Sequence, residues 1–241
     1  MAKRYRLVLT NEVSLQGGIL ITGFPGFGNV GFISTKHLVE KLSMRRIGFI
    51  MPPIIPDFTT FEDYGLSLPH EIFVDASKRI AVLLNRVNPS RAFINSFVES
   101  VAELINRINV SEVVMIGGLD VRFREGNEEY RWLKTSQSQR QLDAPMFMKG
   151  PAIVGPLAAL LVYFELHAIP AIAIFPYTEP DRADHRAAAI AIKILNKILN
   201  LDVPVDELLK YAQYVEQMEE SLKKLVMEGM QQEDKRSVMY M

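Results

Sequence analysis

The sequence predicts an α/β protein in which a mostly parallel sheet is covered by helices on both faces, as a three-layer sandwich. Strand-like segments rich in Val and Ile alternate along the chain with segments whose apolar residues recur at helical spacing. These strand-like segments are apolar on both faces, so each needs cover from both sides of the sheet. With 241 residues, 49% of them hydrophobic and 23% charged, the chain can bury a core of this kind.

The first half of the chain contains three expected strands and two expected helices. Residues 17–24 form a short buried strand, which a glycine-rich turn joins to a helix over residues 30–42. Two prolines end the next strand, over residues 45–51, and a further strand covers residues 79–87. The helix over residues 89–109 opens with a proline, which suits the first helical position, and carries an apolar stripe along one face.

The second half continues the alternation. A strand over residues 111–120 is followed, after a polar stretch, by a helix over residues 152–167. A strand over residues 169–177 and a helix over residues 182–200 complete the series. Strands separated in this way by helices favour parallel pairing, because the chain must cross back over the sheet between them.

The polar stretch from Val121 to Gln141 interrupts this pattern and holds Trp132, the one tryptophan of the chain. Loops of this length often carry function, and an exposed tryptophan can anchor an interface. A solvated hairpin explains the same composition. Both interpretations remain open at this point, and the sequence assigns no role to the segment.

Composition and charge exclude several classes of protein. The 27 basic side chains nearly cancel the 28 acidic ones, so no overall field favours nucleic acid or an anionic membrane surface. The longest apolar run, Ala152 to Phe164, has 13 residues and falls short of the roughly 20 that span a bilayer. The chain has no cysteine. We expect a soluble, cytoplasmic protein without disulfides or thiolate chemistry.

A glycine-rich loop follows the first core strand and contains the spacing G-x-G-x-x-G. Its glycines are Gly23, Gly26, Gly28 and Gly31. The pattern suits a dinucleotide site, but the acidic residue that should bind ribose about 20 residues later is missing. We therefore interpret the glycines as structural and expect no cofactor, and Phe24 and Phe27 would then pack inside the protein or meet a partner. A nucleotide-binding enzyme that uses Gly26–Gly31 remains an alternative.

No pattern in the sequence indicates catalysis or metal binding. None of the four histidines forms an H-x-x-x-H pair, and no nucleophile elbow, P-loop or calcium loop is present. Asp184 and His185 are adjacent, and adjacent residues of a helix point in different directions. We interpret them as a helix N-terminal aspartate beside a surface histidine, and expect a protein that is not an enzyme.

The C-terminal segment from residue 204 to residue 229 predicts a helix with a heptad seam. Asp206 and Glu207 lie in its first turn, where the helix dipole favours them. Apolar residues then alternate spacings of three and four at Leu208, Tyr211, Val215, Met218, Leu222 and Leu225. The helix could lie on its own domain, but so narrow a stripe favours packing against another helix, through self-association or a partner protein.

The last three residues, Met239, Tyr240 and Met241, place an aromatic ring with a hydroxyl group beside a free carboxylate. Pockets that capture a C-terminal carboxylate are a known mode of recognition. The three residues resemble the hydrophobic-tyrosine-any-residue tail with which proteasome activators and some assembly chaperones enter pockets between subunits of the proteasome α-ring.

The body of the chain resembles the archaeal members of the proteasome assembly chaperone family. The resemblance is carried by "GFPGFGNVG", "MPPIIPDFTTFEDYG" and "FPYTEPDRADHRAAAIAIKIL", and extends from Gly17 to Leu199. It implies an α/β fold, homo-oligomerisation, no catalysis and a proteasome α-ring as partner. Met239 would then be the hydrophobic position, Tyr240 the tyrosine, and the Met241 carboxylate would meet a pocket lysine of the proteasome.

We therefore expect an α/β core over residues 1–203, a heptad helix over residues 204–229 and a flexible tail over residues 230–241. The expected function is that of a homo-oligomeric proteasome assembly chaperone or activator. A scaffold that holds a different protein through its C-terminal helices is the alternative. The sequence does not give the number of subunits, nor whether binding would assist assembly or open the gate.

Overall fold

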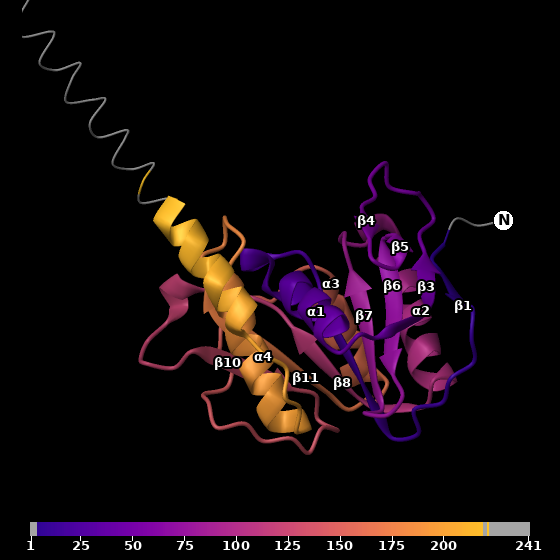
Figure 1. The fold of residues 1–241 in the computed structure, drawn as a ribbon. Helices are drawn as coiled ribbons and strands as arrows, with labels where there is room; N and C mark the ends of the chain where they lie inside the picture. The colour runs from indigo at the N-terminus through magenta and orange to yellow at the C-terminus, as the bar shows by residue number, and fades with distance from the viewer. Residues whose placement is uncertain (1–3, 219–220, 222–241) are drawn as a thin grey trace, which may run out of the picture.

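The structure, a computed structural model, describes residues 4–218 and residue 221. A nine-stranded sheet forms its middle layer, with helices on both sides (Figure 1). The strands of this sheet are β1 (Arg6–Leu9), β2 (Gly18–Gly23), β3 (Arg45–Met51), β6 (His70–Asp75), β7 (Ile80–Asn85), β8 (Val110–Ile116), β9 (Leu119–Asp120), β10 (Tyr130–Lys134) and β11 (Ala171–Thr178). The α-helices are α1 (Val30–Lys41), α2 (Ile94–Arg107), α3 (Pro156–Leu166) and α4 (His185–Leu199), followed by a C-terminal helix described over residues 206–218.

Shorter elements lie between these. Strands β4 (Phe61–Glu62) and β5 (Gly65–Leu66) form a separate two-stranded ribbon, and three 3-10 turns are η1 (Phe27–Asn29), η2 (Arg91–Phe93) and η3 (Val121–Phe123). The predicted α/β class is confirmed.

The sheet is parallel in its centre and antiparallel at both edges. Its strand order is β1-β3-β6-β7-β2-β8-β11-β10, with β9 beside β11. Strands β7, β2, β8, β11 and β9 run parallel. The pairs β1–β3, β3–β6, β6–β7 and β10–β11 are antiparallel. The expected parallel sheet is thus its central part, and the short hairpin over residues 76–79 makes β6 and β7 antiparallel.

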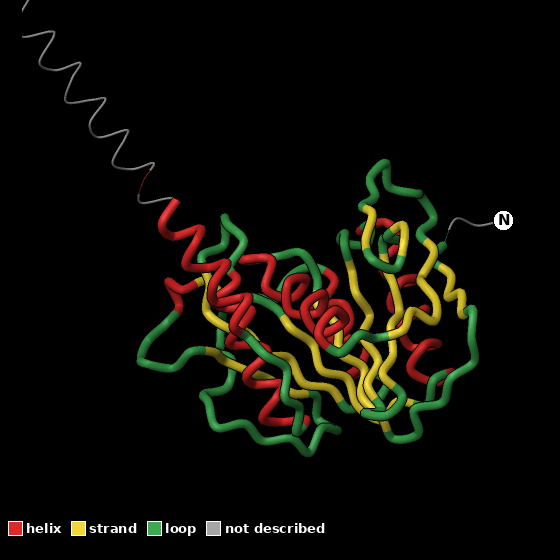
Figure 2. The backbone as a smooth tube through the Cα atoms, in the orientation of Figure 1, coloured by secondary structure: helices red, strands yellow, loops and turns green. Residues whose placement is uncertain are grey.

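Two apolar layers enclose the sheet, as expected for a three-layer sandwich. Successive side chains of the central strand β2 lie in opposite layers. Leu20 packs with α2 and α3, whereas Ile21 packs with α1 and α4. Both side chains are fully buried. Figure 2 shows the strands running between the two sets of helices.

Five strands were not expected from the sequence, namely β1, β6 and β10 of the main sheet and β4 and β5 of the two-stranded ribbon. Strand β1 lies at an edge, paired only with β3 among the described residues. Strand β6 begins with His70 and Glu71, whose side chains are buried in polar networks. Polar residues at the start of a strand hide it from a search for apolar runs.

Several expected boundaries also move. Helix α2 begins at Ile94 rather than at residue 89, because the 3-10 turn η2 precedes it. Helix α3 begins at Pro156 rather than at residue 152, since the residues before it are irregular. The expected strand over residues 111–120 is split into β8 and β9 at Gly117 and Gly118.

Both interpretations of Trp132 are wrong. The residue lies in β10, an edge strand within the polar stretch, and is 2% exposed. Its Nε1 donates a hydrogen bond to the backbone oxygen of Ala144 at 2.9 Å. The polar residues of the stretch surround one inward-facing aromatic ring, which belongs to the layer shared with α1 and α4.

Within the part of the chain that the structure describes, no helix has both the length and the apolar character needed to cross a membrane. The same residues bring no three His, Asp or Glu side chains together as a group that could hold a metal ion.

Candidate functional site

The glycine loop, residues 23–31, joins the carboxyl end of β2 to α1 and is packed tightly by its own chain. A Cβ atom at Gly31 would lie 2.5 Å from the backbone oxygen of Ile116. At Gly28 the backbone adopts φ +61°, and a Cβ atom there would overlap the side chain of Thr178. Glycine is needed at these positions because other parts of the protein occupy the space.

The backbone groups of the loop are also bound internally. Gly28 N–H donates to the backbone oxygen of Pro180 at 3.4 Å, and Asn29 N–H donates to that of Gly26 at 2.8 Å. The oxygen of Gly28 accepts from Asp184 N–H at 2.8 Å. In a dinucleotide site such N–H groups would face the pyrophosphate, so these contacts favour the structural interpretation of the loop.

Strand order separates this protein from a dinucleotide-binding fold. In that fold the strand after the first helix lies beside the first strand and carries the ribose-binding acid. Here β3 follows α1, but β6 and β7 lie between β3 and β2. An acidic residue at the end of β3 would therefore be too distant to reach a ribose at the glycine loop.

Asp184 and His185 have separate roles at the start of α4. The Asp184 carboxylate accepts hydrogen bonds from Ala187 N–H at 2.8 Å and from the Thr178 hydroxyl at 2.8 Å, so it caps the helix. The His185 ring lies 4.1 Å from the ring of Tyr211 on the C-terminal helix. Burial lowers the pKa of His185, and Asp184 opposes that shift. Asp184 therefore caps α4, whereas His185 contacts the C-terminal helix.

A buried polar network holds the end of β2, where the glycine loop begins. The Asn85 amide donates to the backbone oxygen of Gly23 at 3.0 Å and to Thr22 Oγ1 at 3.0 Å. Its Oδ1 lies 2.8 Å from His70 Nδ1, and since Oδ1 can only accept, Nδ1 carries the proton. Burial beside the rings of Tyr5 and Phe97 lowers the pKa of His70 to about 4. The histidine is therefore neutral and acts as a donor that orients Asn85.

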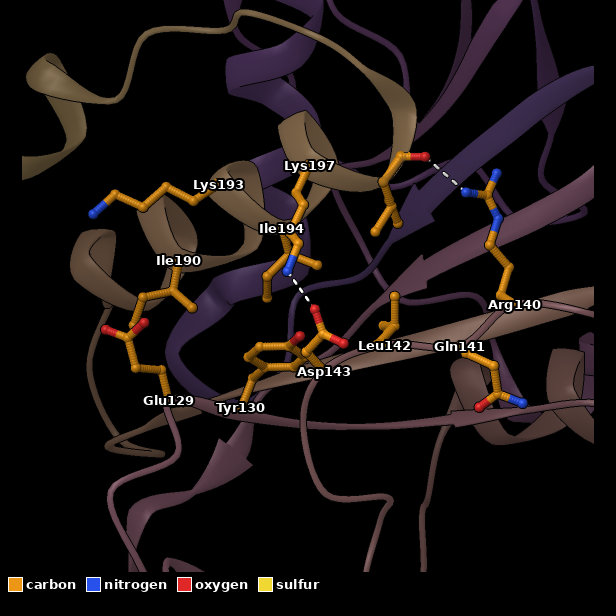
Figure 3. Close-up of a pocket in the computed structure, with 11 residues that line it drawn as sticks. Glu129, Tyr130, Arg140, Gln141, Leu142, Asp143, Ile190, Lys193, Ile194 and Lys197 are labelled. Atoms are coloured by element: carbon orange, nitrogen blue, oxygen red, sulfur yellow. Dashed lines mark hydrogen bonds and ion pairs between the residues drawn. The ribbon is translucent and has the colours of Figure 1, made fainter.

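A pocket of about 430 Å³ lies between α4 and the segment after β10 (Figure 3). Lys197 Nζ and Asp143 Oδ2 meet across it at 2.6 Å, and Arg140 Nη1 donates to the backbone oxygen of Ile198 at 2.7 Å. Lys197 lowers the pKa of Asp143, and Asp143 raises that of Lys197. The side chains on the two sides bind one another, so we assign the pocket a structural role in fastening this segment to α4.

A second cavity, of about 460 Å³, lies at the carboxyl ends of β2, β8 and β11, beside the glycine loop. Five phenylalanines line it: Phe24, Phe27, Phe123, Phe147 and Phe175. We call it the apolar cavity.

The remaining wall of the apolar cavity consists of aliphatic, glycine and proline residues and Asn88, without a charged side chain. The Asn88 amide already donates to the backbone oxygen of Pro25 at 2.7 Å. A phosphate group would find no countercharge there, so the lining fits apolar groups instead.

Sequence reasoning missed the apolar cavity because its walls come from segments far apart in the chain. Phe24 and Phe27 gave the one available signal, since they flank the glycine loop at a strand end. Phe24 is buried, as packing requires, whereas Phe27 is half-exposed at the mouth of the cavity. The mouth also exposes Phe123 and Val154.

The C-terminal helix is only partly packed against the domain. Leu208 is 5% exposed and belongs to the layer with α1 and α4. Tyr211 and Met218 are 52% and 48% exposed, and Val215 lies beside the start of α4. The predicted seam is thus buried at its first residue, whereas Tyr211 and Met218 are about half exposed and Val215 is partly buried. Its remaining members, Leu222 and Leu225, and the tail residues Met239, Tyr240 and Met241 lie outside the described residues.

Comparisons with known proteins identify relatives of the whole domain. The profile of the PAC2 family matches residues 20–225. A crystal structure of Pyrococcus furiosus PbaA, described as an archaeal homolog of proteasome-assembly chaperone, superposes with a TM-score of 0.82 at 24% identity, covering 99% of this chain and 100% of that one. A second crystal structure of PbaA gives 0.76 at 25% identity, covering 89% and 94% of the two chains.

Two further relatives extend the comparison. Pyrococcus furiosus PbaB, described as an archaeal proteasome activator, has a TM-score of 0.75 at 18% identity, covering 92% of this chain and 100% of that chain. An uncharacterized protein of Methanocaldococcus jannaschii is 25% identical over 219 residues, which is 90% of either chain.

Proposed function

This chain belongs to the PAC2 family, and from that premise we propose that it is a non-enzymatic, homo-oligomeric protein that binds the proteasome α-ring as an assembly chaperone or activator. The observation that carries the proposal is the likeness to PbaA over 99% of this chain and all of that one, which includes the region of the C-terminal helix. PbaB, described as a proteasome activator, shares the fold.

We propose that the C-terminal helix directs the tail towards this partner. Leu208 anchors the helix in the core, and the Arg186 guanidinium binds the Glu216 carboxylate at 2.9 Å, two turns further on. The described part of the helix, which ends at residue 218, reaches beyond the sheet near the start of α4 (Figure 1). Tyr240 would then fill a pocket between α-ring subunits, and the carboxylate of Met241 would meet a lysine.

Magnitudes explain why such a protein would act as an oligomer. Burial of one aromatic side chain contributes about 1.5–3 kcal/mol, and a charge-assisted hydrogen bond about as much again. Ordering each tail residue costs roughly 1–2 kcal/mol. A single tail would thus bind weakly, whereas several tails on one assembly would gain on the order of 100-fold from effective concentration.

The glycine loop and the apolar cavity favour this function over a nucleotide-dependent enzyme. Within the loop, the N–H groups of Gly28 and Asn29 bind partners in the same chain, and the cavity beside it lacks a charged side chain. A scaffold for a different protein would use the same C-terminal helix without the tail. The experiment must therefore separate the tail from the helix.

Binding to the purified proteasome core particle, measured by surface plasmon resonance, tests the proposal. Tyr240→Ala should weaken binding by about 2–3 kcal/mol for each tail, and one residue added after Met241 should displace the carboxylate with a similar effect. Tyr214→Ala, at an exposed tyrosine of the C-terminal helix, is the matched control and should bind as the parent does. Parent-like binding by both tail variants would exclude the tail as the docking element.

A further inference from the structure

The segment over residues 54–66, which we call the ribbon, exposes an unusual set of large apolar side chains. They are Ile54, Ile55, Phe58, Phe61 and Leu66, and Phe61 is 84% exposed. Phe61 and Leu66 face each other in the register of β4 and β5, so their side chains form one surface. Monomeric proteins rarely leave such a patch in water unless it is an interaction site.

Polar contacts fix the base of the ribbon to the domain. Glu62 binds Arg86 at 2.9 Å and Lys36 at 3.4 Å. The Tyr64 hydroxyl donates to the buried carboxylate of Glu71 at 3.0 Å, and Arg86 Nε donates to the same carboxylate at 3.0 Å. The polar side of the ribbon therefore faces the protein while its apolar side faces solvent, which is the reverse of an ordinary surface hairpin.

The ribbon and the apolar cavity lie along the same edge of the sheet. The ribbon follows the carboxyl end of β3, and the cavity lies at the carboxyl ends of β2, β8 and β11. Strands β6 and β7 lie between β3 and β2, so the two features are separated by about 15–20 Å at a spacing of about 4.8 Å per strand. Figure 1 shows the ribbon projecting beyond the sheet near β4 and β5.

The two features are complementary in shape and chemistry. The ribbon is a projection with apolar tips, whereas the cavity is a hollow of about 460 Å³ with an apolar mouth and no charged side chain in its wall. The anchored base of the ribbon prevents it from reaching the cavity of its own subunit. A second copy of the chain brings a ribbon without that constraint.

We propose that the ribbon of one subunit inserts into the apolar cavity of the next copy, so that the subunits associate head to tail. The two surfaces of such a contact differ, and repetition of the contact closes into a ring when the rotation permits. In any closed ring, equivalent parts lie at the same height along the axis. All C-terminal helices would then emerge at one level, as multivalent docking to a ring-shaped partner requires.

This inference deepens the self-association in the proposed function and is independent of which protein the tail binds. Sedimentation velocity of the full chain tests it. The ribbon variant Phe61→Ser/Leu66→Ser removes apolar tips, and the cavity variant Val154→Glu places a charge at the mouth. All three residues are exposed in the single subunit, so the fold should persist. Circular dichroism and melting temperature check this.

Each variant alone should have the mass of one subunit at concentrations where the parent is an oligomer. Leu166→Ser and Val162→Glu, at exposed residues of α3, repeat the same chemical changes away from both surfaces and should keep the parent mass. An equimolar mixture of ribbon and cavity variants should form dimers and nothing larger. The intact ribbon of the cavity variant can enter the intact cavity of the ribbon variant, and no second contact is possible.

The alternatives give different masses. A ribbon that pairs with another ribbon would leave the cavity variant oligomeric, and a contact made by the C-terminal helices would leave both variants oligomeric. Either result overturns the inference, as does a monomeric parent or a mixture that stays monomeric. Parent-like proteasome binding together with unchanged mass in both variants would overturn this inference while leaving tail docking intact.

Discussion

The glycine loop and the C-terminal helix differ in how far the protein satisfies its own groups. In the loop, the backbone donors of Gly28 and Asn29 have partners within the chain, and the space beside Gly31 is filled by backbone. In the helix, Leu208 is buried, whereas Tyr211 and Met218 remain about half exposed. The region whose motif suggested a ligand is closed, and the region whose motif suggested association leaves apolar surface available.

This difference shows why a motif and a site are distinct. A glycine pattern reports only that side chains are excluded, and either a ligand or the protein itself can exclude them. A heptad pattern reports an apolar stripe, and its buried fraction shows how much of that stripe the domain already uses. Substitutions in the glycine loop should therefore change the free energy of unfolding strongly, and substitutions at the exposed residues of the C-terminal helix should change it little.

The largest effect is expected from Gly31→Ala. Its Cβ would lie 2.5 Å from Ile116 O and 2.7 Å from Phe24 N, both backbone atoms that cannot move aside easily. Overpacking of this kind should cost about 3 kcal/mol in the free energy of unfolding, measured by chemical denaturation.

Gly26→Ala is the matched control within the same loop. Its Cβ would have 3.9 Å to the nearest atom, and its φ of −164° is extended, so the change should stay within about 0.5 kcal/mol. If the loop bound a ligand, a side chain at Gly26 would be the one excluded, because Gly26 is the glycine that borders open space. Equal costs at Gly26 and Gly31 would contradict the structural interpretation.

The next effect is a pH dependence from His70, whose partner Asn85 holds Gly23 at the start of the loop. The pKa of His70 falls from 6.5 to about 4 on burial, so the unfolded chain takes up a proton first as the pH drops. The contribution of His70 to the free energy of unfolding is fully present above its unfolded pKa of 6.5. It should decline by about 3 kcal/mol as the pH falls to 4.

His70→Gln should remove this part of the pH slope, as seen by denaturation at pH 7, 5.5 and 4, because glutamine does not titrate. His185, at the contact with the C-terminal helix, is half-buried and shifted in the same direction. His185→Gln should therefore remove a smaller part of the slope. A larger change from His185 than from His70 would reverse the comparison between the two regions.

A smaller effect is expected at the anchored end of the C-terminal helix. Leu208→Ala leaves space in the layer beneath it and should cost about 2 kcal/mol. The loss should be greatest in the hydrogen-exchange protection of residues 206–216. Met218→Ala, at a half-exposed position of the same helix, should change stability by less than about 0.5 kcal/mol. Similar losses at both positions would mean that the domain holds the whole seam.

Much of the central fold could be predicted because each central strand carries apolar residues on both faces. Strand β2 is an example, with Leu20 and Ile21 packed in opposite layers. The edges were harder, since β6 begins with His70 and Glu71, whose polarity is satisfied only by long-range partners such as Asn85 and Arg86. Such pairing depends on tertiary structure and leaves no local signal.

Of the candidate sites, too, some could be predicted from the sequence and others could not. The sequence alone predicted structural glycines, because the missing acid after β3 argued against a nucleotide. It did not predict the apolar cavity, whose lining residues Phe27, Phe123 and Phe175 meet only after three strand ends are brought together. Nor did it predict the ribbon, since an exposed Phe61 and a buried phenylalanine are identical in sequence. The tail residues 239–241 remain a prediction.

The smallest effect is expected from Glu216→Gln, which removes the ion pair with Arg186 between the C-terminal helix and α4. The two side chains are 45% and 51% exposed, so water screens the charges, and the pair should contribute less than about 1 kcal/mol. Faster hydrogen exchange of residues 210–218, with the unfolding midpoint unchanged, is the expected result. The difference from the parent should vanish in about 1 M salt, where the screening length is about 3 Å. If this one substitution instead released the helix as far as Leu208, the helix would be held by charge rather than by its buried first turn, and the contrast with the glycine loop would lose its basis in packing.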